Sequence, residues 1–263
     1  MKNEKMKFGL CARIEYYQDL CDIGYDFIEL PATEIYSTSN SELRNLKKKI
    51  DERNIPCVGF NSYCDESLSI VGDEFSSIKT LEYAKRVCEK AALLGVQNIG
   101  IGAPLARKLP KYYDLKKADE QAREFLTITA EEAYKYRINI LFESLCTKLC
   151  DYMVCTSDAL TMVEQLGIPN LQMVLDFYHM SMMGENITRI SDVMPYVRHL
   201  HISGFDQMGN RTYLFENQLD YFRTAIHSAY NCGYNRTISI EGFTQNFHED
   251  AQRSLSILNQ CCK

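Results

Sequence analysis

The chain has 263 residues, enough for one large domain or two small ones, and 46% of them are hydrophobic, so a sizeable core is available. Its formal net charge is -6 at pH 7, which argues against a protein that neutralises phosphates along a nucleic-acid duplex. No apolar run approaches the roughly 20 residues that span a bilayer. We therefore expect neither a nucleic-acid partner nor a membrane segment.

Short apolar runs alternate with amphipathic stretches along the whole chain, and no Pro/Gly/Ser-rich linker divides it. The apolar runs are rich in Ile, Val, Leu and Phe and are bounded by turn residues, which predicts β-strands. The predicted strands are Lys7–Arg13, Phe27–Pro31, Cys57–Tyr63, Asn98–Ala103, Asn139–Leu145, Leu171–Phe177, His199–Gly204 and Thr237–Phe243.

Helical patterns fill the gaps between these strands, and three of them have recognisable ends. One helix starts at the capping-box pattern Ser39–Glu42, a second ends at Gly95, and a third ends at Gly167. The other helices are predicted at roughly 15–23, 115–136, 187–196, 219–230 and 246–260.

Strands that alternate with helices predict an α/β fold with a parallel sheet. A count of eight strands favours a closed (β/α)₈ TIM barrel, one domain over residues 1–263, rather than an open doubly wound sheet. No G-x-G-x-x-G pattern follows the first strand, which argues against dinucleotide binding.

The 11 cysteines are scattered and lack paired C-x-x-C spacing. The opening segment MKNEKMKFGL has no long apolar stretch before a small-residue cleavage site. We therefore expect reduced, mostly buried thiols and a cytoplasmic protein.

Four of the later strand runs each carry one residue that can bind a metal ion. ILFESL carries Glu143, VLDFYH carries Asp176, HLHISG carries His201 and ISIEGF carries Glu241. Because strand side chains alternate between two faces, these residues fall opposite the apolar side chains that would pack on the helices. We expect them to point inward near the carboxyl ends of the last four strands, where barrel enzymes have their active sites.

Three inward carboxylates would repel one another unless they are paired or coordinated. A divalent cation resolves this conflict, and three oxygen ligands with one imidazole suit Mn²⁺, Co²⁺, Mg²⁺ or Zn²⁺. Each residue alone has a simpler explanation, as a salt-bridged carboxylate or a hydrogen-bonded core histidine, and we assign His199 to the latter. The recurrence in four successive strands favours a metal site.

Other polar residues lie on loops near the same end of the predicted barrel. His179 follows its strand closely and either reaches the substrate or bonds to backbone. Arg211 follows the seventh strand, and Arg107 and Lys108 follow the fourth. Each of these basic residues could bind an anionic or hydroxylated substrate.

These residues, in this order, resemble the xylose-isomerase-like barrel superfamily of sugar phosphate isomerases and epimerases. That group includes D-tagatose 3-epimerases, hydroxypyruvate isomerases and inositol-catabolism isomerases. The resemblance covers nearly the whole chain and rests on Glu143 after ILF, Asp176 with His179 in LDFYHM, His201 in HLHISG, Glu241 in SIEG, and the segment GAPLARKLP.

The resemblance implies that Glu143, Asp176, His201 and Glu241 bind one divalent ion, with Mn²⁺ the leading candidate. It implies a metal-dependent isomerase or epimerase that acts on a small-molecule carbohydrate through a metal-stabilised enediolate, with Glu143 and Glu241 as the two bases. His179 would orient the substrate, Arg211 would bind it, and the protein could be a homo-oligomer.

The chain also departs from two branches of this superfamily. Ketose 3-epimerases read E-P-L-N at the fifth strand, where this chain reads ESLC, and their second glutamate falls at Leu149. Their substrate arginine falls at Gln207, for which Arg211 is a candidate replacement. The endonuclease IV branch needs histidines where this chain reads GFNSYCD, NIGIGAP and GFDQMGNR, so a DNA repair nuclease is disfavoured.

Two alternatives to an isomerase or epimerase stay open. A lyase of the same barrel group, either a dehydratase or an enzyme that cleaves C-glycosides, would use the same metal and bases to expel a β-leaving group. A non-catalytic sugar-binding subunit is disfavoured because Glu143 and Glu241 are both present.

Overall fold

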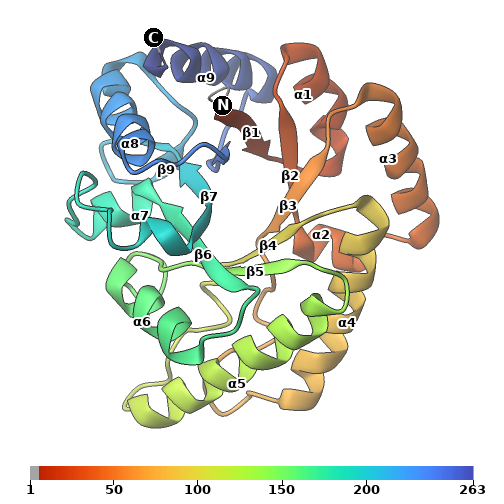
Figure 1. Cartoon of the computed structure of the whole chain (residues 1–263), viewed down its shortest axis with the longest axis vertical. Helices are drawn as coiled ribbons and strands as arrows, with labels where there is room; N and C mark the ends of the chain where they lie inside the picture. Colours follow the sequence, from red (N-terminus) through yellow and green to blue (C-terminus); the bar gives the residue numbers. More distant parts are fainter. Residues whose placement is uncertain (1–5, 263) are drawn as a thin grey trace.

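Eight parallel strands close into a single barrel in the computed structural model, which describes residues 6–262 (Figure 1). The strands are β1 (Lys7–Cys11), β2 (Phe27–Pro31), β3 (Cys57–Asn61), β4 (Asn98–Ile101), β5 (Asn139–Phe142), β6 (Leu171–Asp176), β7 (Val197–Ile202) and β10 (Thr237–Ile240). They follow chain order around the ring, and β10 pairs with β1 to close it. The predicted TIM barrel is confirmed. The ends of the predicted domain, residues 1–5 and 263, lie outside the described residues.

Helices surround the ring of strands, as Figure 1 shows. They are α1 (Tyr17–Ile23), α2 (Ala32–Ser37), α3 (Asn40–Arg53), α4 (Ser77–Leu94), α5 (Leu115–Tyr134), α6 (Thr156–Leu166), α7 (Phe177–Met182), α8 (Leu219–Asn231) and α9 (Phe247–Cys261). After β7, β8 (Gly204–Phe205) and β9 (Arg211–Thr212) pair as an antiparallel hairpin, a separate sheet from the barrel.

The three predicted helix ends are confirmed. The Ser39 hydroxyl accepts from the backbone N–H of Glu42, and the Glu42 carboxylate accepts from the backbone N–H of Ser39, which is the capping box that starts α3. Gly95 and Gly167 end α4 and α6 with left-handed backbone at φ +78° and +59°. Glycine adopts this conformation without steric cost, so both helices stop where the sequence predicts.

The predicted helix over 187–196 is wrong. That segment is mostly turn, with only one 3₁₀ turn at Met194–Tyr196. The Asn186 side chain accepts from the backbone N–H of Thr188, and Pro195 has no N–H to donate, so both residues favour a turn over a helix. The helical residues after β6 instead form the short α7, whose six residues are too few for a periodic pattern.

Most strands end two or three residues before the predicted boundary, and this places two candidate ligands just beyond their strands. Glu143 follows β5 and Glu241 follows β10. Both backbones are still held by the neighbouring strand, because the N–H of Glu143 donates to Ile101 and that of Glu241 donates to Ile202, each at 3.1 Å. The two glutamates therefore stand at the rim of the barrel on fixed backbone.

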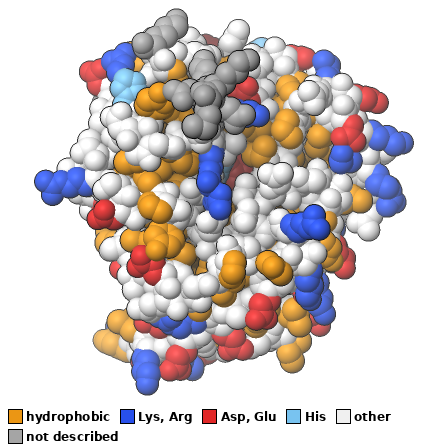
Figure 2. Space-filling model, viewed as in Figure 1, with side chains coloured by type: hydrophobic (Ala, Val, Ile, Leu, Met, Phe, Trp, Pro, Cys, Tyr) orange, Lys and Arg blue, Asp and Glu red, His pale blue; other side chains and the backbone are white. Residues whose placement is uncertain are grey.

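The surface of the described residues has two further features. Within residues 6–262, no helix combines the length and the apolar character needed to cross a lipid bilayer. On the face drawn in Figure 2, basic and acidic side chains are interspersed around the periphery.

Candidate metal centre

The four predicted ligands converge at the carboxyl ends of the strands. Glu143, Asp176, His201 and Glu241 each offer one ligand atom, and these atoms all lie within 4.8 Å of one another. His201 Nδ1 is 3.1 Å from Glu143 Oε1, 3.3 Å from Glu241 Oε2 and 4.0 Å from Asp176 Oδ2. The sequence predicted this convergence.

The local structure fixes each of these side chains. Asp176 ends β6 and also caps α7, because its Oδ1 accepts from the backbone N–H of Tyr178 at 2.7 Å. The other oxygen, Oδ2, faces the centre. Glu143 lies over Gly102, where a Cβ would stand only 2.6 Å from Glu143 Oε2. A glycine at this position therefore leaves the space that the carboxylate fills.

The ionisable groups of the cluster have very different pKa values, because burial and neighbouring charges act on each of them differently. Burial raises the pKa of Glu143 to about 7, although its hydrogen bond to His201 and the charge of His201 oppose the shift. Burial also favours a higher pKa for Glu241. The charges of Arg211 and His201 outweigh this effect and hold the pKa of Glu241 well below its usual range. Burial lowers the pKa of His201, yet Glu241 and Glu29 prevail and raise it well above the ordinary value.

Arg211, which follows the seventh strand of the barrel, lies in direct contact with two of the four candidate ligands. Its Nη1 is 2.7 Å from Glu241 Oε2, and its Nη2 also forms an ion pair with Asp176. The β8–β9 hairpin reverses the chain after β7 and returns Arg211 to the barrel mouth, with the guanidinium 4.8 Å from the centre of the Tyr178 ring. Gln207 lies in the hairpin turn.

His179 bonds to backbone, which is one of the two roles considered from the sequence. Its Nδ1 accepts from the backbone N–H of Cys146 at 3.2 Å, so its Nε2 carries the ring proton. That Nε2 is buried, has no hydrogen-bond partner and lies 3.7 Å from Asp176 Oδ2. Burial lowers the pKa of His179 to about 4, so the ring is neutral at pH 7 and offers one unused donor.

Arg107 does not lie where the sequence suggested. It is fully buried, and its Nη2 donates to the backbone carbonyl of Glu143 at 2.7 Å. It therefore supports the end of β5 from behind and does not offer an exposed loop cation to a substrate. Nε and Nη1 of Arg107 have no hydrogen-bond partner in the structure.

Three polar residues around the cluster were not singled out from the sequence: Cys11, Glu29 and Asn61. Asn61 Nδ2 donates to Glu241 Oε1 at 2.9 Å. Glu29 interrupts the apolar run FIELP, which is the same kind of signal that identified the four candidate ligands. His199 is buried and bonds to Glu29, Ser239 and Thr237, so its assignment as a satisfied core histidine is confirmed.

A cavity of about 530 Å³ opens onto Glu241 and Arg211. A smaller one of about 140 Å³ reaches Glu143, His179 and His201. Leu149 borders both cavities, at the position where the ketose 3-epimerases have their second glutamate. The larger volume lies within the roughly 300–1,000 Å³ common for small-molecule sites.

The sequence pattern of the family described as "Xylose isomerase-like TIM barrel" matches residues 17–261. The chain belongs to this family. No curated protein sequence matches it. Family membership agrees with the closed barrel and with the resemblance drawn from the four strand ends.

Solved structures of sugar epimerases share the fold of this family member. D-psicose 3-epimerase from Clostridium cellulolyticum H10, solved with D-tagatose, has a TM-score of 0.85 and 18% identity over 98% of this chain and 100% of its own. The 3-keto-D-glucoside 4-epimerase of E. coli has a TM-score of 0.81 and 20% identity over 98% and 100%.

A lyase shares the fold as well. The probable 3-DHS dehydratase of Bacillus anthracis has a TM-score of 0.75 and 16% identity, with 97% of this chain and 99% of its own covered. At such identities the likeness shows the barrel alone. The choice between these chemistries therefore depends on the site.

Proposed function

We propose that this protein is a divalent-metal-dependent isomerase or epimerase of a sugar, a sugar phosphate or a polyol. The observation that carries the proposal is the convergence of Glu143, Asp176, His201 and Glu241 within 4.8 Å. Oxygen ligands with one imidazole suit Mn²⁺, and Co²⁺, Mg²⁺ or Zn²⁺ also fit such a set. Family membership and the fold shared with sugar epimerases support the substrate class.

A bound ion would polarise the hydroxyl and carbonyl oxygens of an α-hydroxy carbonyl compound and so acidify the C–H between them. Glu143 and Glu241 would move the proton. They come from β5 and β10, which are not neighbours in the barrel, and both approach His201 Nδ1. The pKa of Glu143 is raised and that of Glu241 is lowered. A pair of carboxyl groups with such different pKa values suits acid–base catalysis, because one can give a proton while the other accepts one.

His179 and Arg211 would hold the substrate oxygens. The neutral ring of His179 keeps an unused N–H beside Asp176, and a buried donor without a partner is costly unless a ligand meets it. Arg211 presents its guanidinium at the larger cavity. A planar fork of donors suits a pair of hydroxyl or phosphate oxygens.

A lyase is the second candidate, and the fold shared with a probable dehydratase favours keeping it. It would use the same proton abstraction next to a carbonyl and then expel a β-leaving group. A lyase makes an unsaturated product, whereas an epimerase or isomerase makes a product of unchanged composition. Product analysis therefore separates the two.

The experiment that tests the proposal is a metal analysis followed by a substrate panel in D₂O. We expect about one bound divalent ion per chain. With Mn²⁺ added, we expect at least one ketose or keto-sugar of the panel to gain one deuterium at the carbon next to its carbonyl. Mass spectrometry and proton NMR detect both the deuterium and the new isomer. A protein that binds no divalent ion, or that binds one without any C–H exchange across the panel, would contradict the proposal.

Metal affinity should rise with pH, because the ion must displace protons. Glu143, with a pKa of about 7, and His201, whose pKa is raised well above its ordinary value, are protonated in the metal-free protein below neutral pH. Protonation of Glu143 alone should therefore weaken metal binding about tenfold for each pH unit below 7. Calorimetric titration with Mn²⁺ from pH 8 to pH 5.5 measures this slope.

The Glu143→Gln variant is the control for this slope. It lacks one of the two protons, so its affinity should depend less steeply on pH. An affinity in the wild-type protein that stays constant over the same range would exclude this set of ligands.

A further inference from the structure

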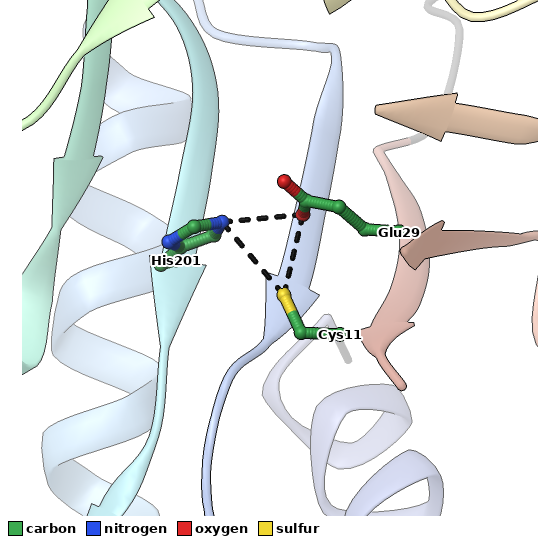
Figure 3. A group of neighbouring side chains, drawn as sticks. All are labelled: Cys11, Glu29 and His201. Carbon is green, nitrogen blue, oxygen red and sulfur yellow. Dashed lines mark hydrogen bonds and ion pairs between the residues drawn. The ribbon is translucent and has the colours of Figure 1, made fainter. Parts of the chain in front are cut away.

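Glu29 lies one layer below the candidate metal centre, and one of its carboxylate oxygens contacts two histidines. It is in β2, and 2% of its surface is exposed. Its Oε2 is 2.9 Å from His199 Nε2. The same oxygen is 3.2 Å from His201 Nε2 and 3.3 Å from Cys11 Sγ, as Figure 3 shows. Figure 3 also shows the contact between Cys11 Sγ and His201 Nε2, at 3.9 Å, so the carboxylate oxygen, the imidazole and the thiol form one cluster.

His201 therefore faces two environments with its two ring nitrogens. Nδ1 points to Glu143 and Glu241, and Nε2 points to Glu29. An imidazole that gives the lone pair of one nitrogen to a metal ion carries its proton on the other nitrogen. A carboxylate that accepts this proton fixes both the tautomer and the orientation of the ring.

We propose that Glu29 is a positioning residue for His201: its carboxylate accepts a hydrogen bond from the Nε2–H group and thereby presents the Nδ1 lone pair to a divalent ion. This inference rests on the proposed function. The negative charge of Glu29 also increases the basicity of the ligand nitrogen, which strengthens its bond to a cation. Glu29 acts through His201 and does not itself reach the reacting atoms.

The surroundings of Glu29 keep its carboxylate in this role. Glu29 packs beside Gly59 of β3, its neighbour across the strand pair. The Cys11 thiol donates to the same Oε2 that the histidines contact. His199 is anchored on its other side, where Nδ1 lies 2.7 Å from Thr237 Oγ1, so it holds Oε2 in place for His201.

Glu29→Gln is the decisive variant, because it keeps the shape and removes the charge. If the amide oxygen takes the place of Oε2, the acceptor is weaker. If the amide nitrogen takes it, that donor favours the tautomer with the proton on Nδ1, which blocks the metal. We expect Mn²⁺ affinity to fall 10- to 100-fold, measured by the EPR signal of free Mn²⁺.

Ser239→Ala is the matched control. Ser239 is equally buried in the barrel, and its hydroxyl lies 2.9 Å from His199 Nε2. A loss caused only by a disturbed core would appear in both variants. We expect Ser239→Ala to bind Mn²⁺ within about threefold of wild type, since the contact to His201 remains.

The second readout is the tautomer of His201, seen in long-range ¹H–¹⁵N correlation spectra of the Zn²⁺-loaded protein. The wild type should show Nε2–H and a metal-shifted Nδ1, and Glu29→Gln should lose the uniform Nε2–H state. Wild-type-like affinity together with an unchanged tautomer in Glu29→Gln would overturn the inference. Should this variant not fold, the wild-type spectrum decides alone, because an Nδ1–H tautomer in the loaded protein overturns it.

The proposed function fails separately from this inference. If the wild type binds no divalent ion, the metal centre itself is wrong. If the wild type binds metal and exchanges substrate protons, but Glu29→Gln behaves like it in both readouts, only the role of Glu29 is wrong.

Discussion

Glu241→Gln is expected to reduce turnover by roughly 10²- to 10⁴-fold even at saturating metal, the range for loss of a general acid or base. The amide keeps the shape and one oxygen donor but cannot carry the proton. Metal affinity should weaken, and excess Mn²⁺ should restore occupancy without restoring turnover. Glu143→Gln should behave in the same way, because both residues face His201 Nδ1. Steady-state rates at several Mn²⁺ concentrations, with occupancy measured in parallel, separate the two effects.

Glu132→Gln is the control for the glutamate variants. Glu132 is buried in α5 and pairs with Lys135, away from the metal centre. It should keep wild-type turnover. A metal-saturated Glu241→Gln protein that turns over at the wild-type rate would exclude the two-base mechanism.

A partial reaction would assign the order of the two bases. If one glutamine variant still exchanges a substrate proton with D₂O but makes no product, the remaining glutamate is the first base. The structure offers an asymmetry for this comparison, because Glu143 has a pKa of about 7 whereas Glu241 is ionised well below that pH.

The barrel and the four converging residues could be predicted because both depend on local signals. Each of Glu143, Asp176, His201 and Glu241 comes directly after, or within, its own apolar run. In a closed parallel barrel, the carboxyl ends of all strands meet on one face. Topology therefore brings together residues that are up to about a hundred positions apart, without any knowledge of loops.

Glu29 carries the same local signal, but one carboxylate in an early strand has no counterpart nearby in the sequence, so the pattern alone does not identify its role. Its meaning depends on His199 and His201, which lie about 170 residues away and meet it only across the barrel interior. The position of each glutamate along its strand determines whether it can contact the metal ion or only a histidine ligand. Glu29 lies below the rim, next to the deeper histidine layer, whereas Glu143 and Glu241 lie just past their strand ends.

The arginines show why loops resist prediction. Arg107 and Arg211 both read as exposed loop cations, yet Arg107 is fully buried behind β5 and Arg211 pairs with Asp176 and Glu241. Arg211 reaches the centre because the β8–β9 hairpin folds back over the barrel mouth. Strands of two residues carry no periodic signal that a sequence pattern could detect.

The position of Arg211 leads to the second large effect: metal binding and turnover should change in opposite directions in Arg211→Met. The guanidinium and a divalent ion are both cations that share the carboxylates of Asp176 and Glu241. Two unit charges about 4 Å apart repel by roughly 4 kcal/mol near a protein surface. Removing Arg211 should therefore tighten Mn²⁺ binding by about tenfold or more, even after local relaxation. Turnover should fall by about 10- to 100-fold, because a charged hydrogen bond to substrate is worth roughly 1.5–3 kcal/mol.

Arg211→Lys is the matched variant, because it keeps the positive charge and loses the planar fork. It should bind Mn²⁺ nearly as the wild type does but still turn over slowly, since one ammonium cannot replace two parallel donors. Titration of Mn²⁺ and measurement of KM and kcat for both variants separate charge from geometry. If Arg211→Met bound Mn²⁺ more than tenfold more weakly than wild type, Arg211 would be holding Asp176 and Glu241 in place for the ion, and its assignment as a competing cation that binds substrate would be wrong.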